Sequence, residues 1–536
     1  MRMNLLLAGA AIAMIAATPA RSAPDPAQES QLRGHVTFLA DDALRGREAG
    51  TPDYDVAAAY VAAQMLAIGL EPAGTDGNWY QPVPLVTASA AAEPEMTLTR
   101  GGTATPLAFG TDFTLRAVAG PERVQVSAPV VFAGYGISDP AIGRDDYAGL
   151  DVRGKIVAIL YSGPKGLNSE ISAHLGSRAD RAVTAGRKGA AGILYLMTSQ
   201  IEGAYPFDQM KRAWQSRAMA WANADGTPRD LGAPALGVIS FAGADKLFGA
   251  KRWAAIRAAD DAGQPLPHRG ALDAAIATDQ RFTVERTTSP NVVGRIPGSD
   301  PSLAAEAVVL TAHLDHVGTK ATGEGDRISN GAMDNAIGIA AMLEVARTLR
   351  ASPTPPRRSI LVVAVTAEEK GLIGSDYFAR FPTIARDRIV ANINLDMPIL
   401  TYRFQDLVAY GADRSSIGAA VDRAARAGGF ALVPDPDPGQ ASFVRTDHYS
   451  FVRQGVPSVS LEPGPGGAGQ AATKLFLDEH YHQVSDDMKQ PFDWTAASAF
   501  VRVNADIALD LANGDARPTW KKGDYFGLLY GGLGAK

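Results

Sequence analysis

Residues 308–316 read Val-Val-Leu-Thr-Ala-His-Leu-Asp-His, an apolar run that ends in polar side chains. The pattern returns twice: apolar residues 360–365 precede Glu368-Glu369, and residues 393–395 precede Asp396. Short apolar runs of this kind are typical of buried strands. Asp334 instead ends a glycine-containing loop and begins a pattern typical of an amphipathic helix, with its apolar stripe on Ile337, Ala341, Met342, Val345 and Leu349.

These polar groups are expected to meet at one place. In an open α/β sheet, groups at the carboxyl ends of neighbouring strands converge on one crevice. A set of carboxylates and imidazoles gathered there, with no Lys or Arg among them, would repel itself unless a cation lay in the middle. Imidazole and carboxylate ligands without thiolate suit zinc, and manganese or cobalt fit the same geometry. The stretch therefore predicts a metal site.

Bulk properties exclude several classes of protein. A chain of 536 residues is long enough for two or three domains and a large core. It contains no Cys, which excludes disulfides, thiolate metal sites and Cys nucleophiles. With 51 basic and 57 acidic residues the formal net charge is −6, and a mildly acidic chain without basic clusters is a poor nucleic-acid binder.

The amino terminus resembles a secretory signal peptide. A basic start at Arg2 is followed by an apolar run over residues 5–17 and small residues up to Ala23. The run is too short to span a membrane comfortably, so an uncleaved anchor is the less favoured alternative. We expect removal of residues 1–23 and export to the periplasm or the extracellular space. The mature chain is not expected to contact a membrane.

The pattern of expected strands and helices divides the remaining chain into four segments. Strand and helix patterns alternate from about residue 285, which predicts an α/β fold with a mostly parallel central sheet flanked by helices. Residues 24–117 and 280–515 are assigned to this domain, residues 118–279 to a β-rich α+β insert, and residues 516–536 to a C-terminal tail. Short strands are expected in the insert at 124–126, 130–132, 156–161, 193–196 and 236–240.

Five motifs, taken together and in this order, resemble the signatures of the co-catalytic di-zinc aminopeptidase family, which includes glutamate carboxypeptidase and the transferrin receptor. The motifs are Ala312-His313-Leu-Asp315-His316-Val-Gly318, Asn330-Gly-Ala-Met-Asp334-Asn335, Ala367-Glu368-Glu369-Lys-Gly371, Asn394-Leu-Asp396-Met397 and Tyr481-His482-Gln-Val-Ser-Asp486. The insert resembles a protease-associated domain, mainly through Asp145-Asp146-Tyr-Ala-Gly-Leu-Asp151 and the segment 187–193. Such domains shape access to a site or mediate contacts.

The resemblance implies a role for each residue. His313, Asp334 and Asp396 would hold one zinc ion, and Asp334, Glu369 and His482 the other, with Asp334 as the bridge. Glu368 would be the general base. Asp315 would orient the His313 ring, an arrangement that also follows from their His-x-Asp spacing. A cis peptide bond between Asp334 and Asn335 is a further expectation.

Some assignments stay open. His480 lies two residues before His482 and is the alternative ligand, although the Tyr-His-x-x-x-Asp context favours His482. We expect His316 to lie behind the ligands or in solvent. Thr446-Asp447-His448-Tyr449 is either a group of supporting and substrate-pocket residues or a packed turn. Arg45, Arg47 and Glu48 form either a functional cluster or, as we favour, a salt-bridged turn before a helix. Thr51 or Asp53 is expected to cap that helix and Gly69 to end it. In the tail, Trp520, Tyr525 and Phe526 are expected to pack onto the body.

The favoured hypothesis is an exported di-zinc exopeptidase that removes amino-terminal residues from peptides. Activated water would give a proton to Glu368, which would pass it to the leaving amine. The alternatives are a carboxypeptidase, a dipeptidase or an acyl-amino-acid hydrolase on the same site. A non-catalytic receptor-like module is disfavoured because every expected ligand is retained, and the oligomeric state is left open.

Overall fold

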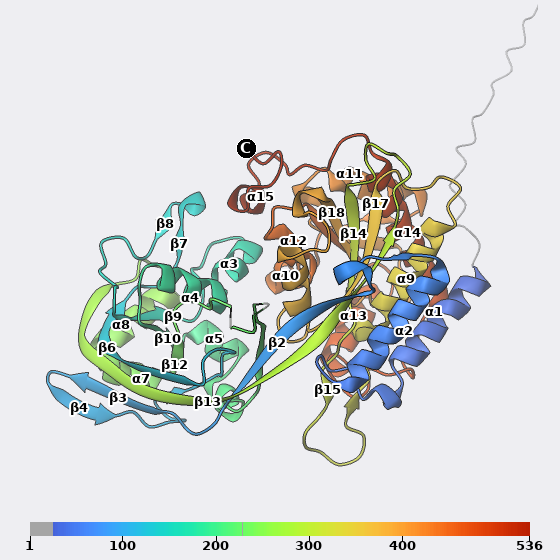
Figure 1. Ribbon diagram of the computed structural model, residues 1–536. Coiled ribbons are helices and arrows are strands. Elements are labelled where there is room, and N and C mark those ends of the chain that lie inside the picture. The colour runs from blue at the N-terminus through green and yellow to red at the C-terminus, as the bar shows by residue number, and fades with distance from the viewer. Residues whose placement is uncertain (1–24, 224, 228) are drawn as a thin grey trace, which may run out of the picture.

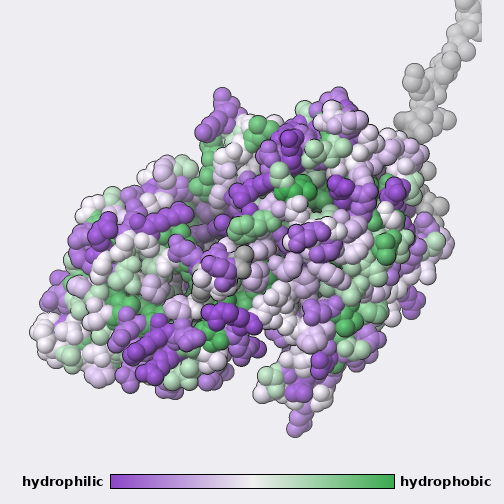
Figure 2. Space-filling view, viewed as in Figure 1, coloured by the Kyte–Doolittle hydropathy of each residue, from purple (hydrophilic) through white to green (hydrophobic). Residues whose placement is uncertain are grey.

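The computed structural model describes residues 25–536 except 224 and 228, and it has two lobes joined by long strands (Figure 1). The predicted leader, residues 1–23, lies outside the described residues. Among the residues that are described, no helix is long and apolar enough to cross a membrane. Hydrophilic and hydrophobic residues are intermixed on the visible face of both lobes in Figure 2.

The larger lobe contains a mixed sheet with a parallel centre. Its order is β11-β2-β13-β17-β14-β18-β21-β19-β20, and β1 pairs with β13. The strands are β1 (Glu71–Pro72), β2 (Tyr80–Ala90), β11 (Ala218–Trp221), β13 (Gly270–Ile296), β14 (Ala307–His313), β17 (Ser359–Val365), β18 (Ile389–Asn394), β19 (Asp406–Tyr410), β20 (Ala431–Leu432) and β21 (Ser458–Pro463).

The pairs β17–β14, β14–β18 and β18–β21 are parallel, which confirms the predicted α/β class with a parallel centre. Antiparallel strands extend this centre on both sides, through β13 and β2 at one side and β19 at the other. The sheet is therefore more mixed than the alternation of strands and helices alone indicates.

Helices cover both faces of this sheet because its central strands are apolar on both sides. Val308, Leu310 and Ala312 of β14 pack with α1 (Pro26–Leu39), α2 (Pro52–Ile68), α9 (Ile337–Arg350), α11 (Ile417–Ala427) and α14 (Trp494–Asn513). Val309 points to the opposite face, where it packs with Phe378 of α10 (Ile373–Arg380) and Phe451 of α12 (His448–Val452). The remaining helices of this lobe are α13 (Gly469–Glu479) and α15 (Tyr525–Leu529).

Local signals set the ends of α2 as expected. The Thr51 hydroxyl accepts from the Tyr54 amide at the start, and Gly69 adopts a left-handed conformation at the end. The tail also packs as expected: Trp520 and Phe526 are buried with Phe443 and Tyr449, and Tyr525 packs against the same cluster.

The smaller lobe holds a second sheet with its own core. Its strands are β3 (Glu95–Arg100), β4 (Thr103–Pro106), β5 (Phe113–Thr114), β6 (Arg123–Phe132), β9 (Ile156–Leu160), β10 (Gly192–Leu196), β12 (Ala235–Ile239) and the first half of β13. The segments 124–126 and 130–132, predicted as two strands, form the single strand β6. The helices are α3 (Ser169–Leu175), α4 (Arg178–Arg187), α5 (Ser199–Ala204), α6 (Phe207–Arg212), α7 (Phe241–Phe248) and α8 (Ala250–Asp261).

One strand belongs to both sheets. β13 pairs with β3 and β6 through residues 270–281 and with β2 through residues 282–292. Three strands that precede residue 118, namely β3, β4 and β5, lie in the sheet of the smaller lobe. The predicted domain limits stay a proposal. Two small ribbons, β7 (Ser138–Asp139) with β8 (Arg144–Asp145) and β15 (Gly318–Thr319) with β16 (Ile328–Ser329), complete the fold.

Candidate metal centre

The carboxyl ends of β14, β17 and β18 form the base of the site. His313 is the last residue of β14 and pairs with Val365, the last residue of β17. Asp396 follows β18 by two residues, and Glu368 and Glu369 lie in the turn after β17. Because these strands are parallel neighbours, their ends bring the three polar groups to one edge of the sheet, as the sequence predicts.

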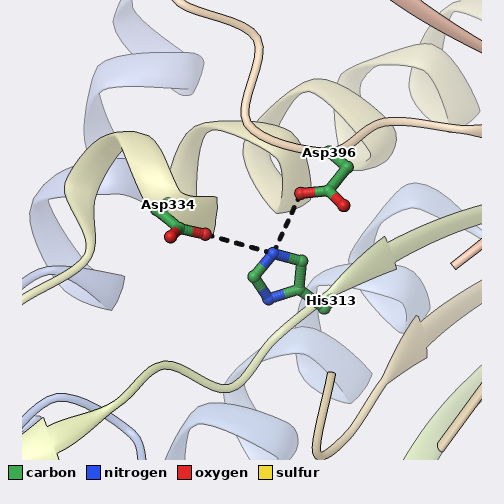
Figure 3. A group of neighbouring side chains, drawn as sticks. All are labelled: His313, Asp334 and Asp396. Carbon is green, nitrogen blue, oxygen red and sulfur yellow. Dashed lines mark hydrogen bonds and ion pairs between the residues drawn. The ribbon is translucent and has the colours of Figure 1, made fainter. Parts of the chain in front are cut away.

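The first cluster consists of His313, Asp334 and Asp396. The His313 Nε2 atom lies 3.2 Å from Oδ1 of Asp334 and 3.0 Å from Oδ1 of Asp396, and the two carboxylates approach the ring from different sides (Figure 3). All three side chains are buried, with residue exposures of 1%, 3% and 8%. Their ligand atoms are close enough together to hold one metal ion.

The second cluster uses the other oxygen of Asp334. Its members are Asp334, Glu369, His482 and His316. The His482 Nε2 atom lies 3.3 Å from Oδ2 of Asp334 and 3.0 Å from Oε2 of Glu369. The His316 Nδ1 atom lies 2.7 Å from Oε1 of Glu369. Asp334 thus presents one oxygen to each cluster, which is the arrangement of a bridging carboxylate.

Asp334 is held at the start of α9 by an irregular turn over Ala332–Ala336. The peptide bond between Asp334 and Asn335 is cis, which confirms the expectation. The Asp486 carboxylate accepts the Asp334 amide at 3.0 Å and the Met333 amide at 2.8 Å. The Asn335 side chain donates to the Leu395 carbonyl and accepts from the Met397 amide, so the turn is tied to the segment that carries Asp396.

Asp315 supports the site differently from the expectation. Its carboxylate accepts the main-chain amides of Glu368 at 3.0 Å and Glu369 at 3.4 Å. The His313 Nδ1 atom instead lies 3.1 Å from the main-chain oxygen of Asp315. The side chain therefore positions the turn with the two glutamates, and the backbone orients the imidazole. Alternation along a strand places the two residues on one face but does not specify which oxygen the ring meets.

Burial and charge shift the titration of the site. Burial raises the pKa of Glu368 well above the usual value for glutamate, and Asp396, Asp447 and Glu369 add to the rise against the opposing effect of His313. Burial alone would lower the pKa of His482, but the nearby carboxylates of Asp334 and Glu369 outweigh it and raise the pKa to about 10. The site therefore favours positive charge at its centre.

The donor set fits a divalent metal. Glu369 Oε1, both ring nitrogens of His316 and His482 Nε2 are buried atoms that make no hydrogen bond, despite their short separations. A buried polar atom without a hydrogen bond is costly, and a metal bond removes that cost. Neutral imidazoles and carboxylates without thiolate form a typical zinc ligand set.

The alternative ligand His480 lies outside the two clusters. Its Nδ1 atom is 2.8 Å from the Ser485 hydroxyl. His316, expected behind the ligands or in solvent, is fully buried, and its ring lies beside the carboxylates of Asp334 and Glu369. The Thr446–Tyr449 loop is packed, with Asp447 and His448 fully buried, and burial raises the pKa of Asp447 to about 7.

One supporting residue differs from its sequence interpretation. Arg45 pairs with Asp53, as a turn before a helix requires. Arg47 is buried and donates to the carbonyls of four residues around the metal loops, namely Leu39, Leu314, Asn330 and Gly331. The sequence does not indicate this burial, because an isolated Arg in a polar turn is usually a surface residue. The neighbouring glycine, Gly46, is the one local sign of tight packing in the sequence. In the structure it lies so close to Gly318 and Ser329 that a Cβ would not fit.

Comparison with known proteins points to the same part of the chain. Residues 291–508 match the model of peptidase family M28. The leupeptin-inactivating enzyme 1 of Streptomyces exfoliatus is 33% identical over 132 residues, which are 24% of this chain and 27% of that protein. Aminopeptidase YwaD of Bacillus subtilis is 35% identical over 111 residues, 20% of this chain and 22% of that protein. The matches thus span about a quarter of the length of these relatives.

Solved structures resemble a larger share of the chain at lower identity. An aminopeptidase from Aneurinibacillus sp. strain AM-1 is 20% identical with a TM-score of 0.47, covering 89% of this chain and 92% of that one. BSAP, a zinc aminopeptidase from Bacillus subtilis, is 20% identical with a TM-score of 0.42, covering 89% and 94%.

Proposed function

We propose that the chain is a zinc-dependent exopeptidase that removes amino-terminal residues from peptides, and the match of residues 291–508 to the model of peptidase family M28 supports this proposal. The observation that carries the proposal is the position of Asp334. Its two oxygens face two separate groups of ligand atoms, His313 with Asp396 on one side and Glu369 with His482 on the other. Paired sites with a shared carboxylate are typical of hydrolases.

We propose two zinc ions as the cofactors of the protein. His313, Asp334 and Asp396 would hold one ion, and Asp334, Glu369 and His482 the other. Zinc in such a site polarises a scissile carbonyl and lowers the pKa of water to about 7.

Glu368 is the proposed general base. It belongs to neither ligand cluster, yet it lies in the same turn as Glu369 and its carboxyl is surrounded by the charges of the site. A carboxylate at this position can take a proton from water and give it to the leaving amine. Asp315 fixes the turn through the amides of both glutamates, so it acts as a positioning residue.

We further propose export after removal of residues 1–23, on the basis of the basic, apolar and small residues in that segment. Residues 118–279 are proposed to form a protease-associated domain that shapes access to the site. Four strands of that segment, β6, β9, β10 and β12, lie in the sheet of the smaller lobe, in line with a unit that has its own core.

The test is hydrolysis of aminoacyl anilides and short peptides by the purified mature chain. We expect release of the amino-terminal residue, loss of activity with a chelator and recovery with zinc. Acetylation of the substrate amine should abolish turnover, whereas amidation of its carboxyl end should not. Full activity in the chelated protein would reject the metal mechanism, and turnover of acetylated substrates would favour the carboxypeptidase or acyl-amino-acid hydrolase alternatives.

A further inference from the structure

We propose that His316 is a fourth protein ligand of the second metal, beside Asp334, Glu369 and His482. The inference rests on the proposed function because it assumes that the two clusters hold zinc. The site would then be asymmetric, with four protein ligands on the second metal and three on the first.

The geometry of the His316 ring carries the proposal. Its Nδ1 atom lies 2.7 Å from Oε1 of Glu369 and 3.8 Å from Oδ2 of Asp334. Two donors on one zinc, each at about 2.0–2.1 Å in a tetrahedral arrangement, stand roughly 3.3–3.4 Å apart. The two measured separations lie on either side of this value, so small shifts of the His316 and Glu369 side chains would place all three atoms around one ion.

Neither nitrogen atom of the His316 ring is satisfied by another group. The side chain is fully buried, and neither Nδ1 nor Nε2 makes a hydrogen bond. The short contact with Glu369 lacks hydrogen-bond geometry, which disfavours a simple imidazolium–carboxylate pair. A buried imidazole with both nitrogens unsatisfied is costly unless a metal takes one of them.

The backbone and its neighbours hold the ring in place. The His316 amide donates to the Arg47 carbonyl at 3.3 Å. Gly331 packs against the ring so closely that a Cβ there would lie 2.6 Å from Cγ of His316. The His316 and His482 rings meet edge to face with centroids 5.6 Å apart, so two imidazoles converge on the same carboxylates. This packing fixes the ring orientation that ligation requires.

The asymmetry has a functional meaning. Zinc sites closed by four protein ligands are typically structural, whereas catalytic sites keep an open position. The second metal would then be the more firmly held ion. The first metal, with His313, Asp334 and Asp396, would keep the open positions where a substrate carbonyl enters.

The test is equilibrium competition for zinc between a chelator and the full mature chain, with His316→Gln compared with wild type. We expect the affinity of one of the two sites to fall by more than about 100-fold, beyond the roughly 10–100-fold that residues outside the coordination sphere contribute. In the cobalt-substituted protein, the visible d–d bands should change in position and intensity. His480→Gln, which removes a nearby imidazole bonded to Ser485, is the matched control and should leave both readouts unchanged.

An unchanged cobalt spectrum, or a loss of zinc affinity of less than about 100-fold, would overturn the inference. If His316→Gln does not fold, a structure of the zinc-loaded wild-type chain decides: a His316 nitrogen within about 2.0–2.1 Å of the metal supports ligation, and a distance beyond 3 Å rejects it, as judged against zinc–imidazole bonds. A wild-type chain that takes up no zinc would defeat the proposed function itself. Normal zinc binding and hydrolysis in wild type, together with an unaffected His316→Gln, would defeat only the role of His316.

Discussion

Glu368 and Glu369 are adjacent carboxylates with separate tasks. Glu369 faces two imidazoles of the second cluster, whereas burial, with a smaller effect of Asp396 and Asp447, raises the pKa of Glu368. We predict that Glu368→Gln lowers kcat by about 10²–10⁴-fold, because the amide cannot carry a proton. Zinc content, measured by atomic emission, should stay at the wild-type value. Glu369→Gln should instead lose zinc, and a Glu368→Gln variant with wild-type kcat would exclude this residue as the base.

Arg47 and Arg45 form a matched pair for a test of burial. Arg47→Met leaves the carbonyls of Leu314, Asn330 and their neighbours without a donor, at a cost of about 1–3 kcal/mol for each group left unsatisfied. We predict a loss of at least about 3 kcal/mol in the free energy of unfolding, measured in urea. Arg45→Met removes an ion pair whose Arg side chain is 63% exposed, and should cost less than about 1 kcal/mol. Equal losses in the two variants would contradict the structural role of Arg47.

For individual residues, the sequence predicts which side chains form the site better than it predicts what those side chains contact. His313, Asp334, Glu369, Asp396 and His482 come together because three of them follow parallel strands, and strand ends are visible in the apolar pattern. The positions of Arg47 and His316 depend on how the loop at Asn330 and Gly331 folds against the amino-terminal segment. Such packing between distant segments leaves no local signal in the sequence.

At the scale of elements, the two lobes are joined by ion pairs as well as by strands. Arg453, directly after α12, donates to both oxygens of Asp180 in α4 at 2.7 and 3.0 Å. Burial alone would raise the pKa of Asp180, but Arg453 outweighs it and holds the pKa below the usual range. The pair therefore ties a helix of the smaller lobe to the larger one.

We predict that Asp180→Asn lowers the free energy of unfolding by about 2 kcal/mol at pH 7, the usual size for hydrogen bonds to charged groups. The folded pKa of Asp180 is depressed, so its contribution is complete above the unfolded value of about 3.9 and is lost as the pH falls through the folded pKa. The difference between wild type and variant in urea unfolding should thus shrink towards pH 2. Asp151→Asn, at an exposed pair with Lys155, serves as the control. A difference that is constant with pH would contradict this assignment.

The helices and strands themselves were largely predictable from periodicity and caps. The amphipathic helix predicted after Asp334 appears as α9, and the Thr51 and Gly69 signals mark the ends of α2. The pairing of β13 was not predictable, because alternation of apolar and polar residues shows that a segment is extended without showing which sheet it joins. Residues 270–296 form one continuous strand, and this strand pairs in two sheets.

For the whole molecule, the metal site should contribute to stability. Several buried carboxylates meet at one edge of the main sheet, and a bound cation offsets their repulsion. A ligand present at about a thousand times its Kd stabilises the folded state by about 4 kcal/mol. We predict that chelation lowers the midpoint of thermal unfolding by several degrees and that zinc restores it. An unchanged midpoint in protein shown to have lost its zinc would contradict this view.

The strand shared by the two sheets has a mechanical consequence. A hinge needs residues that are free to rotate, but residues 282–292 of β13 are all committed to the ladder with β2. Relative movement of the lobes must therefore bend the ladder between β2 and β13, to which β11 adds a third strand over residues 218–221. Bending of this ladder also requires the Arg453–Asp180 ion pair between the lobes to lengthen or break, so both features oppose a change in their separation.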